Sequence, residues 1–214
     1  MKRRLASMLR TTGFAVLILL GFYISYVSAL RYFIGAEPGP PPVVANAFAS
    51  PWLVIHVIGA TVALVVGPFQ FVAAIRTRWP RFHRLTGYTY VTACAVGAPA
   101  GLLLSFGTTA GPIAGAGFAA LGLLTIVFTW LGLRAAVARK FDEHREWMIR
   151  SYALTAAAIT LRLMIPASFM LGLDFFAAYR VIAWACWLTN LALVESYIRW
   201  TRPAARRFAR LAPA

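Results

Sequence analysis

PWLVIHVIGATVALVVGPFQFVAAI, residues 51–75, is a run of 25 residues that contains no Asp, Glu, Lys or Arg. An α-helix rises about 1.5 Å per residue, so roughly 20 apolar residues cross the hydrocarbon core of a bilayer. Backbone polar groups in lipid must find their hydrogen-bond partners within the segment, and a single segment does this only as a helix. The stretch therefore predicts a transmembrane helix.

Apolar runs of similar length recur along the whole chain. Of its 214 residues 61% are hydrophobic and 13% are charged, whereas a soluble domain is about 45–50% apolar and about 25% charged. We predict an all-α, polytopic transmembrane helix bundle that forms one domain over residues 1–214. The predicted spans are 12–34, 51–75, 86–106, 114–135, 147–171 and 177–199.

The positive charge is arranged as a topology signal. The chain has 21 Lys and Arg, 6 Asp and Glu, and a net charge of +15, which in a soluble protein would point to nucleic acid. Here four basic residues precede the first span, and groups of four, five and five follow the second, fourth and sixth spans. By the positive-inside rule these segments and both termini are cytoplasmic. We therefore expect a multi-pass protein of the bacterial inner membrane, with lipid and not nucleic acid around it. A protein partner or a second copy stays open.

The first apolar run resembles a signal peptide, because basic residues precede it and Val27-Ser28-Ala29 resembles a cleavage site. The apolar character continues to Ile34, which favours an uncleaved first helix. The Pro-rich stretch 37–42 is expected to be a stiff linker on the outer side. Cys94 and Cys186 lie inside apolar runs, and we interpret both as small packing residues.

Small residues spaced four apart form ridges on several predicted helices. Such ridges let helix backbones approach closely in lipid, where no hydrophobic effect drives association. We expect them to serve packing and to shape cavities. They are Gly59-Ala63-Gly67, Gly97-Gly101 and Gly111-Gly115-Ala119.

Polar side chains inside spans are costly and mark candidate sites. His56 and Arg162 lie roughly 7 Å and 13 Å from the outer ends of their predicted helices, so they occupy similar depths. With Arg180 they form an outer group that would suit an anionic or quinone-like molecule, or haem propionates. The alternative is that His56 links two helices and that Arg180 is an interfacial anchor. Arg162 demands partners, since no acidic residue in the spans lies at its depth.

An inner group consists of His83, His144 and Met148. His144 and Met148 are four residues apart and share a helix face, and that face continues to Arg162. His83 and His144 are candidate ligands for a b-type haem or a transition metal, with Met148 as a softer third ligand and Arg145 as an anion-binding neighbour. The alternative is that both histidines are interface residues beside basic loops.

Other catalytic signals are absent from the sequence. It has no phosphate loop, nucleotide fingerprint, zinc-protease helix or Gly-x-Ser-x-Gly elbow, and whether it is an enzyme stays open. The leading hypothesis is a small redox membrane protein that binds one b-type haem or a quinone. The rival is a non-catalytic subunit or assembly factor, and a small-solute transporter comes third.

The segment from His144 to Arg162 begins His-Arg-Glu-Trp-Met-Ile-Arg. It resembles a bacterial family of predicted membrane proteins, domain of unknown function 2306, as do His56 with Gly67-Pro68-Phe69-Gln70 and the segment Arg81-Phe82-His83-Arg84 with Gly87. The resemblance covers roughly residues 50–200 and implies no established activity. It implies that these residues belong to the family pattern: His56, His83, His144, Arg145, Met148, Arg150 and Arg162.

Overall fold

The computed structural model describes residues 2–33 and 45–201, with side chains from residue 12 onward. Within these ranges the chain is helical and has no strand, and six segments are long and apolar enough to cross a membrane. The all-α prediction with six spans is therefore confirmed. The predicted Pro-rich linker, the N-terminal basic side chains and the basic tail beyond Thr201 lie outside the described residues.

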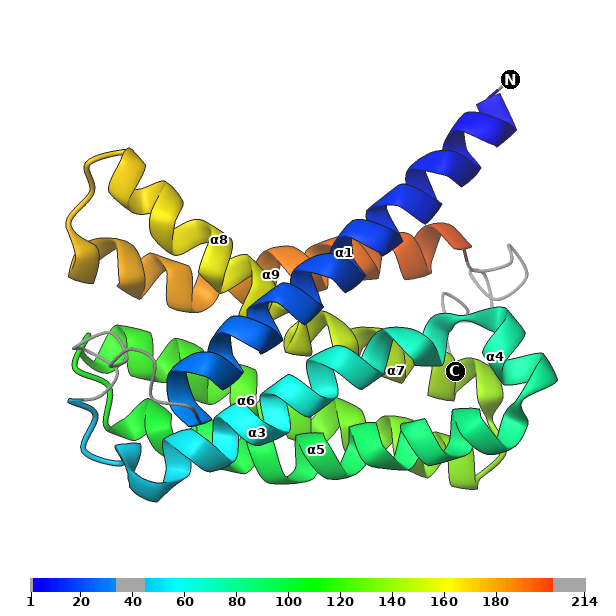
Figure 1. The fold of residues 1–214 in the computed structure, drawn as a ribbon, viewed down its shortest axis with the longest axis horizontal. Helices are drawn as coiled ribbons and strands as arrows, with labels where there is room; N and C mark the ends of the chain where they lie inside the picture. The colour runs from blue at the N-terminus through cyan, green and yellow to red at the C-terminus, as the bar shows by residue number, and fades with distance from the viewer. Residues whose placement is uncertain (1, 34–44, 202–214) are drawn as a thin grey trace, which may run out of the picture.

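The six crossings alternate in direction along the chain, and α7 and α8 together form the fifth of them (Figure 1). We call the end where α5 and α7 begin the inner end, and the end where α6 and α9 begin the outer end. Helix α1 crosses the bundle obliquely and packs on α3 and α8. The elements are α1 (Lys2–Phe33), α3 (Ala49–Val66), the 3₁₀-helix η1 (Gly67–Phe71), α4 (Ala73–Arg78), α5 (Pro80–Phe106), α6 (Pro112–Val137), α7 (Phe141–Thr155), α8 (Ala157–Met170) and α9 (Phe175–Thr201).

Several predicted boundaries are wrong at the inner end. Helices α5 and α7 begin six residues before the predicted starts at 86 and 147, because polar residues at a membrane surface continue a helix that an apolar window does not detect. The predicted second span, 51–75, ends as a regular α-helix at Val66. Pro68 lacks the N–H group that would continue the α-helical hydrogen-bond pattern, and the chain passes into η1 and then α4.

Helices α3 and α5 touch along their glycine ridges. A Cβ added at Gly59 would lie 2.6 Å from the Gly97 Cα atom, and a Cβ at Gly97 would lie 3.0 Å from the Gly59 Cα atom. Only glycine at both positions permits this approach of the two backbones. The packing role predicted for these ridges is confirmed here.

The fifth crossing is interrupted near its middle, where α7 ends at Thr155 and α8 begins at Ala157. Asn190 of α9 holds the interruption in place. Its Nδ2 donates to the Ala153 carbonyl over 3.1 Å, and its Oδ1 accepts a hydrogen bond from Thr160 Oγ1 over 3.0 Å. The predicted span 147–171 is confirmed as one crossing, and the break at Ala156 is a feature that the sequence did not predict. Beyond it α8 runs beside α9, and residues on both sides of the interruption line a cavity.

Candidate functional site

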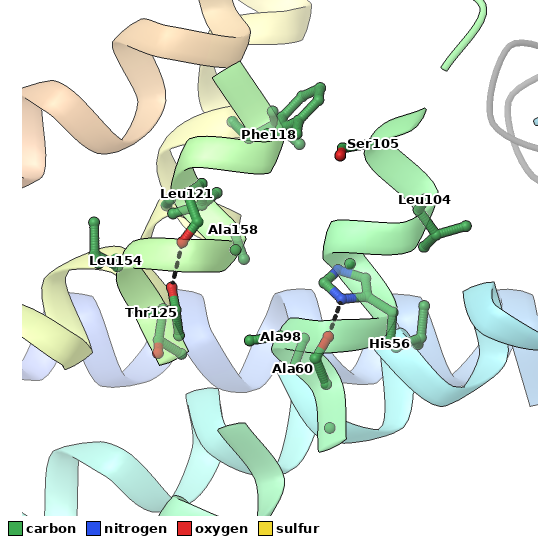
Figure 2. Close-up of a pocket in the computed structure, with 18 of the residues that line it drawn as sticks. His56, Ala60, Ala98, Leu104, Ser105, Phe118, Leu121, Thr125, Leu154 and Ala158 are labelled. Atoms are coloured by element: carbon green, nitrogen blue, oxygen red, sulfur yellow. Dashed lines mark hydrogen bonds between the residues drawn. The ribbon is translucent and has the colours of Figure 1, made fainter. Parts of the chain in front are cut away.

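A cavity of about 290 Å³ lies toward the outer end of the bundle, with walls from α3, α5, α6, α8 and α9 and further residues from the ends of α1 and α7. Small and aliphatic side chains make up most of the wall (Figure 2). The volume is at the lower end of the roughly 300–1,000 Å³ found for small-molecule sites. The polar side chains that line it are Tyr32, Asn46, His56, Ser105, Thr108, Thr125, Thr155, Arg162 and Tyr179.

His56 projects from α3 into this cavity. Its Nδ1 lies 2.8 Å from the Gly97 carbonyl oxygen. A carbonyl only accepts hydrogen bonds, so Nδ1 carries the hydrogen in the neutral ring. Within the described part of the chain the second nitrogen, Nε2, has no hydrogen-bond partner, and Figure 2 shows it on the open side of the ring. His56 therefore offers the cavity a fixed acceptor.

Gly101 makes room for the His56 ring. A Cβ at Gly101 would lie 2.7 Å from His56 Nδ1 and 2.8 Å from Cε1. Gly97 supplies the carbonyl and Gly101, one turn further along α5, supplies the space. The ridge that packs α3 on α5 thus also sets the orientation of the imidazole.

Arg162 enters the same cavity from α8. Its guanidinium donates to Ser28 Oγ of α1 over 3.0 Å and to the Ala158 carbonyl over 3.2 Å. It lines the same cavity as His56. Neither contact neutralises the guanidinium charge, and Arg162 is an exposed residue. The donors of Arg162 and the acceptor of His56 therefore serve one space, as expected from their depths.

The third member of the predicted outer group is placed elsewhere. Arg180 donates from Nε to the Ala110 carbonyl over 3.0 Å and is not part of the cavity wall. It ties the start of α9 to the loop before α6. The contact therefore fits the alternative that Arg180 is an anchor near the membrane interface better than it fits a ligand-binding role.

Sequence reasoning missed several residues of the cavity. Cys94 and Cys186 are its two thiols, and Tyr179 brings a hydroxyl from α9. The only signal for Tyr179 and Cys186 was their spacing of seven residues, which places them two turns apart on one helix face. Such spacing is equally typical of a packing face.

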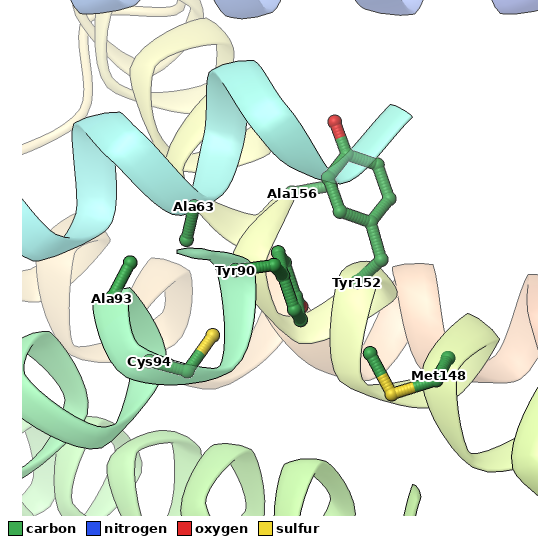
Figure 3. Packing of buried hydrophobic residues seen from close by; sticks show 7 residues of the cluster. All are labelled: Ala63, Tyr90, Ala93, Cys94, Met148, Tyr152 and Ala156. Atoms are coloured by element: carbon green, nitrogen blue, oxygen red, sulfur yellow. The ribbon is translucent and has the colours of Figure 1, made fainter. Parts of the chain in front are cut away.

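The inner group is brought together only in part. His83 and His144 lie close enough to interact electrostatically. Nδ1 of His144 is 2.8 Å from the Gly132 carbonyl, and one end of the Gln70 carboxamide is 3.2 Å from Nδ1 of His83. Met148 is buried in a packed cluster with Tyr90 and Tyr152 (Figure 3). The described residues contain no group of three or more His, Cys, Asp or Glu that could hold a metal ion.

The arginines near the inner end contact α9. Arg145 donates to the Tyr197 hydroxyl over 3.2 Å. Arg150 binds both carboxylate oxygens of Glu195, approaches Glu146 within 3.7 Å and stacks over the Trp147 ring. These contacts fasten α7 to α9. They give Arg145 and Arg150 a structural role.

Six apolar crossings with buried polar groups define a multi-pass integral membrane protein in a lipid bilayer. The model of the family described as "Predicted membrane protein (DUF2306)" matches residues 53–198, and the chain belongs to this family. The match includes His56, Arg162 and both inner histidines, and it begins after α1. Neither the comparison with curated proteins nor that with solved structures gave a match.

Proposed function

We propose that the outer cavity binds a small, mostly apolar molecule of the quinone class, and that the protein is a quinone-binding component of the bacterial inner membrane. The observation that supports this is the pairing of His56 Nε2 with the Arg162 guanidinium across one apolar cavity. Both termini would be cytoplasmic, as the charge pattern predicts.

Quinones match the chemistry of this wall. A quinone ring is apolar on its faces and carries carbonyl oxygens at opposite edges. Arg162 donates hydrogen bonds to a carbonyl and stabilises the negative charge of a reduced ring. His56 accepts from a hydroquinone hydroxyl when neutral and donates when protonated. A volume of about 290 Å³ suits a head group, and the alkyl tail of a membrane quinone would extend outside it.

The binding test uses purified protein in nanodiscs and a short-chain benzoquinone, with affinity measured by tryptophan fluorescence quenching. Removing a charged hydrogen-bond donor costs about 1.5–3 kcal/mol, so Arg162→Gln should weaken binding about tenfold or more. His56→Ala should weaken it as well. Arg180→Gln is the matched control, because that arginine bonds a carbonyl outside the cavity. Equal effects of the two arginine variants would contradict the proposal.

The inner histidines support a second candidate, a b-type haem or a single metal ion. The hydrogen bond from His144 Nδ1 to the Gly132 carbonyl leaves Nε2 as the ligating atom, and metal-binding histidines usually have such a partner. Purified protein from haem-replete cells should then show a b-type absorption spectrum that His83→Ala and His144→Ala abolish. A colourless, metal-free protein would exclude this candidate and leave the quinone site untouched.

A further inference from the structure

Four hydroxyl groups form a continuous chain at the centre of the bundle. Thr129 Oγ1 lies 2.7 Å from Ser151 Oγ, Ser151 Oγ lies 2.8 Å from the Tyr90 hydroxyl, and that hydroxyl lies 3.0 Å from Thr155 Oγ1. The groups come from α5, α6 and α7. Ser151 is fully buried and Tyr90 is 1% exposed. Thr155, at the end of α7, lines the outer cavity.

Two of these hydroxyls, those of Ser151 and Thr129, differ from most Ser and Thr hydroxyls in the described part of the protein. Thr89, Thr125 and Ser196 donate to the carbonyl four residues earlier in their own helix, which satisfies a hydroxyl in lipid without a partner helix. Ser151 and Thr129 instead bond side chains of other helices: Ser151 Oγ contacts the Tyr90 hydroxyl and Thr129 Oγ1, and Thr129 also contacts the Cys94 thiol. A buried polar network is costly unless every member is satisfied. Packing alone would be served by apolar side chains.

The four hydroxyls donate their hydrogen bonds in one direction, from Thr129 toward Thr155. Thr155 Oγ1 donates to the Ser151 carbonyl over 3.2 Å, so its oxygen is left to accept from Tyr90. Tyr90 has one hydrogen, so it accepts from Ser151, and Ser151 accepts from Thr129. Each hydroxyl between the ends both donates and accepts, which is the arrangement through which a proton can be passed on by successive hydrogen-bond exchange.

We propose that the Thr129–Ser151–Tyr90–Thr155 chain delivers protons from the inner half of the bundle to the molecule bound in the outer cavity. The inference rests on the proposed quinone site. Reduction of a quinone by two electrons forms two O–H bonds and consumes two protons. The relay ends at Thr155, which lines the cavity, and its last transfer requires the Thr155 hydroxyl to turn from the Ser151 carbonyl toward the bound molecule. At its other end Thr129 lies about one helical turn from Gly132, whose carbonyl holds His144.

The test reduces the bound short-chain quinone in nanodiscs with a prereduced viologen, a one-electron donor that carries no proton. Viologen oxidation and the uptake of protons by a pH dye are followed in the same mixture. Tyr90→Phe and Ser151→Ala should slow proton uptake about a hundredfold or more, the scale of a single proton-transfer group. Quinone affinity should not change, since neither residue belongs to the cavity wall.

Tyr152→Phe is the matched control. Tyr152 lies beside Tyr90 in the same buried cluster (Figure 3). Its hydroxyl donates to the Leu64 carbonyl over 3.2 Å and does not belong to the row of four hydroxyls. Ser151→Ala and Thr129→Val remove one hydroxyl each, so they test the inference if Tyr90→Phe does not fold. Proton uptake at the wild-type rate in variants that bind quinone would overturn the relay. Absence of quinone binding in the wild type would overturn the proposed function and the relay with it.

Discussion

At Gly101 the His56 imidazole occupies the space that any side chain would need. Gly101→Ala should push the ring out of line with the Gly97 carbonyl and break the hydrogen bond that fixes Nε2 toward the cavity. We expect weaker quinone binding, by about tenfold, with a smaller change in thermal stability. Quenching titrations and thermal unfolding measure the two effects.

Gly21→Ala is the control for this substitution. A Cβ at Gly21 would meet Leu64 at 3.6 Å, an ordinary van der Waals distance, and Gly21 lies on α1 away from His56. It should leave both binding and unfolding near wild type. If Gly101→Ala binds quinone as tightly as Gly21→Ala does, the orientation of His56 does not matter to the site.

The two cysteines provide a second test at the residue scale. Cys94 and Cys186 are both buried and both line the cavity, and the chain has no other cysteine. A small, membrane-permeant thiol reagent should therefore label the protein slowly, and quinone should slow the labelling further. Mass spectrometry of Cys94→Ala and Cys186→Ala separates the two sites. Labelling that quinone does not change would place the ligand elsewhere.

Depth alone was enough to predict that His56 and Arg162 share a space, because two groups at one level of a narrow bundle have few places to lie. It was not enough for Arg180, which is near the same surface but reaches the Ala110 carbonyl. Hydrogen bonds to backbone carbonyls leave no trace in sequence. For the same reason the partners of His56 and His144, the carbonyls of Gly97 and Gly132, could not be predicted.

At the scale of the element, the interruption between α7 and α8 carries the largest consequence for the site. Neither Gly nor Pro marks it, since residues 153–160 read Ala-Leu-Thr-Ala-Ala-Ala-Ile-Thr. Hydropathy therefore predicts one continuous crossing. Asn190, which lies 30 positions after Thr160 in the sequence, hydrogen-bonds Ala153 and Thr160 on the two sides of the interruption. Local composition is enough to predict where the chain crosses the membrane. It is not enough to predict a hydrogen bond between side chains and backbone of two different helices.

Asn190→Leu should destabilise the bundle. It leaves the Ala153 carbonyl without its side-chain donor and removes the acceptor of Thr160. The expected loss is about 1–3 kcal/mol of unfolding free energy, measured by denaturant titration in detergent micelles. Thr189→Val is the control, because its exposed hydroxyl bonds only the Ala185 carbonyl of its own helix. Wild-type stability in Asn190→Leu would mean that these two hydrogen bonds contribute little to the stability of the bundle.

At the scale of the whole molecule, basic residues gather at the inner end. Arg76 and Arg78 lie on α4, Arg81 and Arg84 on the first turns of α5, and Arg139 at the turn before α7. The loop between α5 and α6, at the outer end, contains none, since residues 107–111 read Gly-Thr-Thr-Ala-Gly. The charge asymmetry predicted from sequence therefore coincides with the two ends of the folded bundle.

This asymmetry predicts that the inner end faces the cytoplasm. Reporter fusions at residues 45 and 109 should be active outside the cytoplasm, and fusions at residue 139 and at the C-terminus inside it. An even number of crossings separates residue 45 from residue 109, and an odd number separates residue 45 from the C-terminus. Opposite sides for 45 and the C-terminus, with 45 inside, would invert the orientation but keep the number of crossings. The same side for both would contradict the six-span topology itself, and with it the depths at which His56 and Arg162 meet.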